Sequence, residues 1–311
     1  MTEVHPARPR SWRRWLQCVR LDEVAVLQGT PLVGFAFALC QAPAVGGRDA
    51  LRLLFALVGA SVCLVAHIIV LNDWAGIDGD LKDPHRSGRT FLELGVSRRE
   101  MGFLALFWAV LGLAFAACLG LQACWIAVAM LATSALYSWP GLHLKGVPLA
   151  GSLLHLAGGS LHFMLGYLAM GTPGPQSLLF AAYFGVVFAA GHLMHEVRGF
   201  RADAGNGIRT NAVVFGPRAT FAAAFGLFSV AYALVALWAA LEHVWLLLGL
   251  SAVAYLRHVA TSWRVHRSGL APAPLVQLQR HYRGHFALMG LVLLGTFAWP
   301  YLRGLLSAPA G

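Results

Sequence analysis

Residues 51–80 read LRLLFALVGASVCLVAHIIVLNDWAGIDGD, an apolar run that ends abruptly at the polar pair Asn72-Asp73. The run over 51–71 is long enough to cross a bilayer as a helix, which needs about 20 apolar residues. Similar runs recur along the chain, and none alternates like a β-barrel strand. The sequence therefore predicts an all-α integral membrane protein with nine transmembrane helices, over residues 24–41, 51–71, 101–119, 122–138, 147–170, 176–197, 219–240, 244–262 and 285–302.

Composition and charge support this assignment. Hydrophobic residues make up 58% of the chain, above the roughly 45–50% of soluble domains. The net charge of +10 could indicate nucleic acid, but its distribution indicates a membrane. When the nine spans are threaded from a cytoplasmic N-terminus, only Arg48, Arg52 and Arg303 among the 23 Lys and Arg residues fall on the opposite side. We therefore expect the lipid bilayer, and no nucleic acid, as partner.

The chain is expected to form a single domain over residues 1–311, because no linker or low-complexity tract interrupts the spans. Residues 1–20 hold Trp12 and Trp15 among arginines, which indicates a segment lying on the cytoplasmic membrane surface. The longest polar connections are 72–100, 198–218 and 263–284, all cytoplasmic in this threading. Function should therefore be sought in the cytoplasmic loops.

The first polar cluster follows the span 51–71 directly and is rich in oxygen ligands. Asn72, Asp73, Asp78 and Asp80 lie within nine residues, and carboxylate and amide oxygens are ligands that Mg²⁺ prefers. Nearby cations could bind phosphate, namely Lys82, Arg86 and Arg89. The alternative is a solvated loop of mixed charge, but polar groups next to the membrane core are usually functional.

The second cluster follows the span 176–197. Glu196 and Asp203 lie seven residues apart, so they share a face if the helix continues. His192 and His195 also share a face and could belong to a transition-metal site, although such a site usually needs more ligands. Ordinary hydrogen-bonded histidines are the main alternative.

These clusters resemble the acidic motifs of UbiA-type intramembrane prenyltransferases. The first family motif has Asn-Asp with further Asp at offsets of four and eight, then Pro and Arg. The chain matches it at Asn72, Asp73, Asp80, Pro84 and Arg89, with Gly76 in place of the Asp at offset four. The second motif is matched at Asp203, Gly207 and Thr210, with Gly199 in place of an earlier Asp. Each motif has thus lost one carboxylate.

A third segment, Tyr137 to Lys145, is similar to the Tyr-Ser-x-Pro-x-x-x-Leu-Lys segment of several family branches. The resemblance covers almost the whole chain and implies nine helices around a central cavity. It also implies Mg²⁺-dependent transfer of a prenyl group from a polyprenyl diphosphate to a hydrophobic acceptor within the membrane. The residues that would carry this activity are Asp73, Asp80, Asp203 and Lys145 as catalytic residues, Asn72, Asp73, Asp78, Asp80, Glu196 and Asp203 as metal ligands, and Arg86, Arg89, Lys145, Arg209 and Tyr137 as diphosphate contacts.

Two compensations for the lost carboxylates are conceivable. Asp78 could swing inward if Gly76 and Gly79 loosen the helix, and Glu196 could replace a ligand at Gly199. Deeper in the chain, His155 and His162 share a face and could orient an acceptor, with simple packing as the alternative.

Several other functions stay open at this stage. The chain could be a UbiA-type terpene cyclase or another diphosphate lyase or transferase, or a catalytically impaired lipid-binding member of the family. A transporter is a further alternative, but the acids gather at one interface and not at mid-membrane.

Overall fold

The computed structural model describes residues 12–42, 44–82, 87–142 and 144–307, and these residues are helical apart from short turns and connections. The helices are α1 (Arg13–Val19), α2 (Leu21–Leu27), α3 (Gly29–Gln41), α4 (Gly47–Asp80), α5 (Arg98–Ala117), α6 (Leu121–Ser138), α7 (Ala150–Tyr167), α8 (Pro175–Gly205), α9 (Asn211–Val214), α10 (Pro217–Leu241), α11 (Trp245–Arg267) and α12 (Pro272–Ser307). Two short 3₁₀ turns, η1 (Ser87–Arg89) and η2 (Leu144–Gly146), lie in the connections. The all-α prediction is confirmed.

Each of the nine predicted spans has a long helix in the described part of the chain. Seven of these helices are long and apolar enough to cross a membrane by themselves, so the count of nine transmembrane spans is not confirmed. The two that fall short are α7 and α11. Histidines and glycines dilute the apolar residues of α7, and the C-terminal half of α11 carries Arg257, Arg264 and Arg267.

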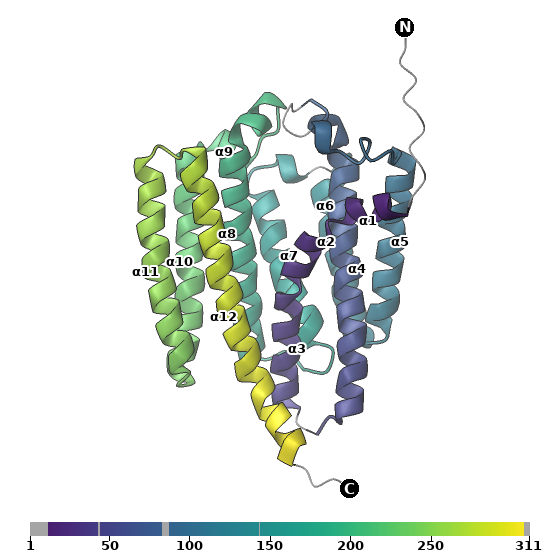
Figure 1. Ribbon diagram of the computed structural model, residues 1–311, viewed down its shortest axis with the longest axis vertical. Helices are drawn as coiled ribbons and strands as arrows, with labels where there is room; N and C mark the ends of the chain where they lie inside the picture. Colours follow the sequence, from purple (N-terminus) through teal and green to yellow (C-terminus); the bar gives the residue numbers. More distant parts are fainter. Residues whose placement is uncertain (1–11, 43, 83–86, 143, 308–311) are drawn as a thin grey trace.

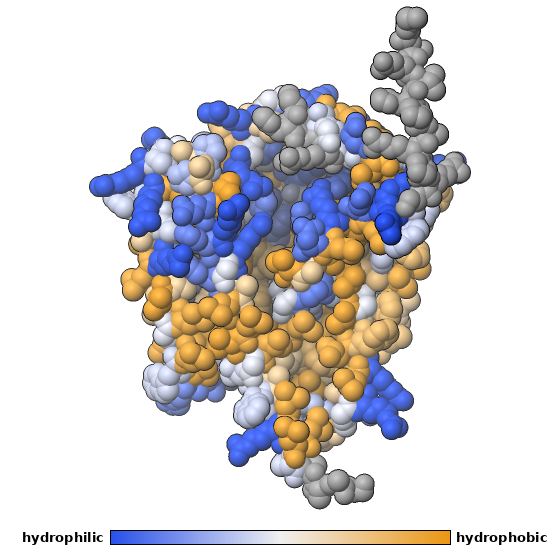
Figure 2. Space-filling view, viewed as in Figure 1, coloured by the Kyte–Doolittle hydropathy of each residue, from blue (hydrophilic) through white to orange (hydrophobic). Residues whose placement is uncertain are grey.

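The helices run side by side in one bundle. In Figure 1, α10, α11 and α12 lie on one side, α4, α5 and α6 on the other, and α3, α7 and α8 lie between them. The closest packing joins α7 to α8, α4 to α5 and α8 to α10. On the face shown in Figure 2, apolar side chains form a band across the middle, while hydrophilic side chains gather at the end that carries α1 and α9. This band is what a lipid-embedded bundle needs.

Close backbone approach fixes α7 against α3 in the centre of the bundle. A Cβ added at Gly34 or Gly166 would run into backbone atoms of the facing helix, namely Phe163 O and Pro31 O. Only glycine allows two helices to approach this closely, as in the small-residue interfaces of membrane proteins. The glycines therefore hold the histidine-bearing helix α7 in the interior.

Two helices are longer than the apolar runs that predict them. Helix α4 continues through Asn72 to Asp80 without a break at Gly76 or Gly79, so the idea that these glycines loosen it is wrong. Helix α8 likewise extends to Gly205. The acidic motifs are therefore the last turns of α4 and α8 and not loops. Helix α12 also begins earlier than predicted, which shortens the connection before it to 268–271.

The two predicted breaks within long apolar stretches are confirmed. Gly120 has φ of +110° between α5 and α6, a backbone conformation that favours glycine. His243 has φ of +57° between α10 and α11. Each turn reverses the chain, so that α5 packs on α6 and α10 packs on α11.

The N-terminal helices α1 and α2 are fastened across the ends of α4 and α5. Arg14 donates hydrogen bonds to Gly95 O and to Glu100, the residue that also closes the capping box of α5. Arg20, in the left-handed conformation between α1 and α2, binds both carboxylate oxygens of Asp73 at 2.5 and 2.6 Å. Trp12 and Trp15 stay exposed, as expected for a segment at a membrane surface.

Candidate functional site

The end of α4 presents Asp73, Gly76 and Asp80 on one face. Residues three, four and seven apart lie above one another on a helix, and α4 is regular through this segment. The Asp73 side chain is 18% exposed and is held by Arg20 through two hydrogen bonds. Asn72, next to Asp73, is partly buried at the side of the same face. One acidic residue of the motif is therefore already paired with a cation.

Gly76 marks the point where Lys145 meets α4. A Cβ added at Gly76 would lie 3.5 Å from Lys145 Nζ and 3.8 Å from Asp80 Oδ2. The ammonium and the carboxylate therefore approach the same small space, although 65 residues separate them in the sequence. The space that an aspartate side chain would take at residue 76 is bordered by a lysine.

The connection that carries Lys145 also reaches the second acidic motif. A Cβ added at Gly146 would lie 3.7 Å from Ile208 Cγ2, in the turn after α8. On α8 itself, a Cβ added at Gly199 would lie 3.4 Å from Asp203 Oδ2. The turn η2 thus lies between Asp80, at the end of α4, and the turn that follows Asp203, at the end of α8. It approaches both helix ends.

The structure does not bring Asp78 to this place. Asp78 is 72% exposed and pairs with Arg98 of α5 at 3.4 Å. Because α4 stays helical, a residue two positions after Gly76 points about 200° away from it. Arg98 also lies over the Trp74 ring, 5.3 Å from its centroid. In this structure Asp78 therefore does not occupy the place of an aspartate at residue 76.

Glu196 lies deeper, in a buried polar network that the sequence did not indicate. Only 5% of Glu196 is exposed, and its Oε1 accepts a hydrogen bond from Asn211 Nδ2 and lies 3.0 Å from His192 Nε2. Asn211 also donates to Ser152 Oγ and accepts from the backbone N–H of Leu149. These bonds tie the start of α9 to α7 and α8, so Glu196 has structural partners in the interior.

The remaining predicted contacts are distributed as follows. Tyr137 packs edge-on against His155 and His192 and lies below η2. Arg209 is exposed beside Ile208, close to the turn that carries Lys145. Arg86 and the side chain of Arg89 lie outside the described residues. Within the part of the chain that the structure describes, no three His, Cys, Asp or Glu residues form a group that could hold a metal ion by themselves.

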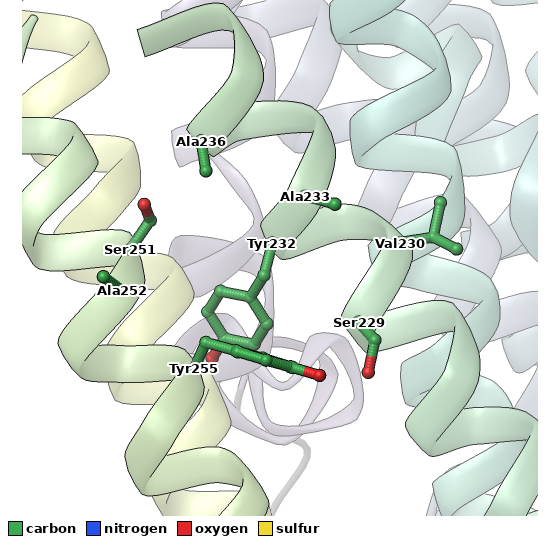
Figure 3. Close-up of a pocket in the computed structure, with 8 residues that line it drawn as sticks. All are labelled: Ser229, Val230, Tyr232, Ala233, Ala236, Ser251, Ala252 and Tyr255. Carbon is green, nitrogen blue, oxygen red and sulfur yellow. The ribbon is translucent and has the colours of Figure 1, made fainter. Parts of the chain in front are cut away.

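A groove lies elsewhere, between α10 and α11, and Figure 3 shows the side chains that line it. They are small residues and two tyrosines: Ser229, Val230, Tyr232, Ala233, Ala236, Ser251, Ala252 and Tyr255. The Tyr232 hydroxyl is bonded to His285 of α12 at 3.1 Å. No residue of either acidic motif lines this groove, so it is separate from the site at the ends of α4 and α8.

Several solved structures of other proteins are similar to this protein. A UbiA homologue from Archaeoglobus fulgidus, solved with DMAPP and Mg²⁺, matches with a TM-score of 0.65 and 16% identity, over 91% of this chain and 99% of that chain. A UbiA homologue from Aeropyrum pernix K1 matches with a TM-score of 0.66 and 19% identity, over 89% and 97%. A digeranylgeranylglyceryl phosphate synthase structure matches with a TM-score of 0.67 and 15% identity, over 92% and 98%.

At such identities these structures show a shared fold. No curated protein sequence matches the chain. The sequence model of the UbiA prenyltransferase family, however, matches residues 31–278, which is most of the chain and includes both acidic motifs. This multi-pass integral membrane protein therefore belongs to the UbiA prenyltransferase family.

Proposed function

We propose that the protein transfers a prenyl group from a prenyl diphosphate to a hydrophobic acceptor within the membrane, with Mg²⁺. The observation that carries this proposal is the meeting of Asp80 and Lys145 beside Gly76. A carboxylate that can bind a metal ion and an ammonium that can bind phosphate oxygens are what a diphosphate leaving group requires. Structures of UbiA homologues with DMAPP or GPP and Mg²⁺ support the assignment of this chemistry.

The donor set suits Mg²⁺. Asn72, Asp80 and Asp203 offer hard oxygen ligands at the ends of α4 and α8. Mg²⁺ usually binds one or two carboxylates and takes its other ligands from water and substrate phosphates. A site that the described residues do not complete alone is therefore consistent with a metal that arrives with the diphosphate. When bound, Mg²⁺ would neutralise negative charge on the diphosphate oxygens.

Fixed cations would complete the diphosphate site. Lys145 is partly buried beside Asp80, so its charge is less screened by water than that of an exposed lysine. Arg209 lies next to the same turn, and Arg86 and Arg89 follow the first motif in the sequence. We propose that these residues stabilise the negative charge that develops on the leaving group when the allylic carbon–oxygen bond breaks.

The hydrophobic partners would approach from the bilayer. On the face shown in Figure 2, apolar side chains lie below the hydrophilic end, so a prenyl tail can stay in an apolar medium while its diphosphate reaches Asp80 and Lys145. The positive-inside distribution favours a cytoplasmic position for this hydrophilic end. The acceptor would then have to be soluble in the membrane.

A catalytically impaired, lipid-binding role is the second candidate, because Gly76 and Gly199 replace two carboxylates and Arg20 pairs with Asp73. An assay of purified protein with geranyl diphosphate and Mg²⁺ distinguishes the transferase from the lipid-binding role. We expect Mg²⁺-dependent diphosphate release that Asp80→Asn or Asp203→Asn abolishes. Wild-type protein that binds geranyl diphosphate at saturating Mg²⁺ without releasing diphosphate would support the binding role, and full activity in both variants would refute the assignment of the site.

A further inference from the structure

A cluster of ionisable and aromatic side chains lies in the interior below the diphosphate site. It consists of Tyr137 from α6, His155 from α7, and His192 and Glu196 from α8. Glu196 and His192 precede Asp203 by seven and eleven residues on one continuous helix. At a rise of 1.5 Å per residue they lie about 10 and 16 Å further along α8, away from the hydrophilic end. The allylic carbon, which is bonded to the diphosphate, would lie between Asp203 and this cluster.

The rings of this cluster touch one another. His155 and His192 stack with ring centroids 3.8 Å apart and planes 13° apart. The Tyr137 ring lies edge-on to both, with centroid distances of 5.0 Å to His155 and 6.0 Å to His192. Gly151 makes room for this arrangement, because a Cβ there would come within 3.0 Å of His192 Nε2. Three helices thus contribute to one polar spot in the bundle.

Polar atoms of this cluster are buried without a hydrogen-bond partner among the described residues. They are His192 Nε2 and Glu196 Oε2, in side chains that are 7% and 5% exposed. The 3.0 Å contact between His192 Nε2 and Glu196 Oε1 is an electrostatic contact whose angles are not those of a hydrogen bond. Unpaired buried polar groups are costly, and ionisable groups at membrane depth usually serve a function. Packing alone would not retain them.

Hydrogen bonding fixes the protonation of His155. Its Nδ1 lies 2.9 Å from the carbonyl oxygen of Gly151. A carbonyl oxygen can only accept, so Nδ1 carries the hydrogen and Nε2 keeps its lone pair. His155 Nε2 therefore has a lone pair that can accept a hydrogen bond or a proton from a bound hydroxyl group.

Open space adjoins His155. Leu153 and Leu156 of α7 are exposed on the lipid side, and the opposite face carries His155 and Gly158. A Cβ added at Gly158 would meet no atom within 4 Å, and the same holds for Gly191, the residue before His192. His155 itself is partly accessible. Additional atoms could thus be accommodated at Gly158 and Gly191, near the histidines.

We propose that this cluster binds the hydroxyl group of a neutral, apolar acceptor and that His155 accepts its proton. This inference rests on the proposed prenyl transfer. The acceptor oxygen forms a bond to the allylic carbon, the carbon–oxygen bond to diphosphate breaks, and its electron pair leaves with the diphosphate. The O–H electron pair stays on the acceptor oxygen as the proton moves to His155 Nε2. The product is a prenyl ether, and no oxidant or reductant is needed.

The cluster also sets the charge of the acceptor. Glu196 is its only acidic or basic chain besides the two histidines, and it is buried among apolar helices. A carboxylate on the acceptor would lie near this negative charge in a medium of low dielectric, where repulsion is strong. We therefore expect neutral hydroxyl compounds to bind in preference to hydroxy acids.

Three related probes test this preference. They are 2-naphthol, its methyl ether 2-methoxynaphthalene, and the anionic 6-hydroxy-2-naphthoate, each added to wild-type protein in nanodiscs with geranyl diphosphate and Mg²⁺. We expect 2-naphthol to bind at least about tenfold more tightly than the other two, the difference that one hydrogen bond or one unfavourable charge produces. Geranyl naphthyl ether should form from 2-naphthol.

Substitutions then test the role of His155. His155→Gln can bind a hydroxyl but cannot take its proton, so we expect 2-naphthol to bind within about threefold of wild type while the turnover number for ether formation falls at least about a hundredfold. His155→Leu should lose both the binding of 2-naphthol and the formation of the ether. His258→Gln is the matched control, because His258 is a buried histidine of α11 outside this cluster. Thermal unfolding of each variant verifies that it is folded.

Several outcomes would overturn the proposal. They are unchanged ether formation in His155→Leu, equal binding of 2-naphthol and its methyl ether, tighter binding of the hydroxy acid, or no binding of any probe. Diphosphate release without acceptor is measured in parallel. If wild-type protein neither binds geranyl diphosphate nor releases diphosphate, the proposed function itself fails. If the His155 variants change only acceptor binding and ether formation, as stated above, and not diphosphate release, the role of His155 is supported separately from the proposed function.

Discussion

Restoring a carboxylate at residue 76 is the most direct perturbation of the site. A Cβ there would meet Lys145 Nζ at 3.5 Å and Asp80 Oδ2 at 3.8 Å, which are ordinary contact distances, so Gly76→Asp fits without moving the backbone. Two unit charges about 4 Å apart interact by about 4 kcal/mol at an effective dielectric of about 20. Attraction to Lys145 and repulsion from Asp80 are therefore similar, and we expect the free energy of unfolding to change by less than about 1 kcal/mol.

The effect on metal dependence should be larger than the effect on stability. A further carboxylate adds one hard oxygen ligand next to Asp80, and a tenfold gain in Mg²⁺ affinity corresponds to about 1.4 kcal/mol. We expect the Mg²⁺ concentration for half-maximal diphosphate release from geranyl diphosphate to fall by about tenfold. The Michaelis constant for geranyl diphosphate should rise, because the new aspartate competes for Lys145.

The controls isolate the charge. Gly76→Asn has the size of aspartate without its charge, and Gly76→Ala adds only the Cβ. Thermal unfolding of all three variants verifies that the fold is kept. If Gly76→Asp and Gly76→Asn show the same Mg²⁺ dependence, the space beside Lys145 and Asp80 is not part of the metal site.

Three further predictions concern the same end of the molecule. A Cβ added at Gly199 would lie 3.4 Å from Asp203 Oδ2, so Gly199→Asp puts a second carboxylate beside the first. Thermal unfolding without Mg²⁺ should then show a loss of about 1–2 kcal/mol that Mg²⁺ restores, whereas Gly199→Asn should show neither effect. A double-mutant cycle of Arg20→Gln and Asp73→Asn should give a coupling energy of about 1 kcal/mol by thermal unfolding, since Arg20 is 44% exposed; a coupling of zero would refute the pairing. Burial, and then the charge of Asp73, raise the pKa of the Cys18 thiol to about 11, so labelling by maleimide should stay slow at pH 8 and accelerate above about pH 10. Mass spectrometry of labelled peptides measures the rate of labelling, and rapid labelling at pH 8 would contradict the burial of Cys18.

The apolar runs were enough to predict the helices, because backbone hydrogen bonding in lipid leaves few alternatives. The breaks at Gly120 and Glu242-His243 were also correct. The ends of α4 and α8 were not predicted, because a helix that leaves the membrane core can continue with polar residues and hydropathy does not mark its end. Hydropathy therefore locates spans better than helix ends.

The candidate site was predictable only where the motif residues are close in sequence. Asp80 and Asp203 follow the family pattern, but Asn211 and its bonds to Glu196 and Ser152 depend on tertiary packing. The partner of Asp73, Arg20, lies 53 residues away, and no period in the sequence connects the two. Such long-range pairs carry no local signal, so they appear only in the folded structure.

Gly76, Gly199 and the ion pair of Arg20 with Asp73 all reduce the negative charge of the site. Arg20 pairs with Asp73, and Asp80 lies beside Lys145 next to Gly76. Aspartates at residues 76 and 199 would add two negative charges to this small region, and a diphosphate would then need metal ions before it could approach. In the proposed site, glycines at both positions would reduce the repulsion that an incoming diphosphate meets. The lost carboxylates therefore do not by themselves argue against diphosphate binding, because in the proposed site Lys145 would take over part of the neutralisation from metal ions.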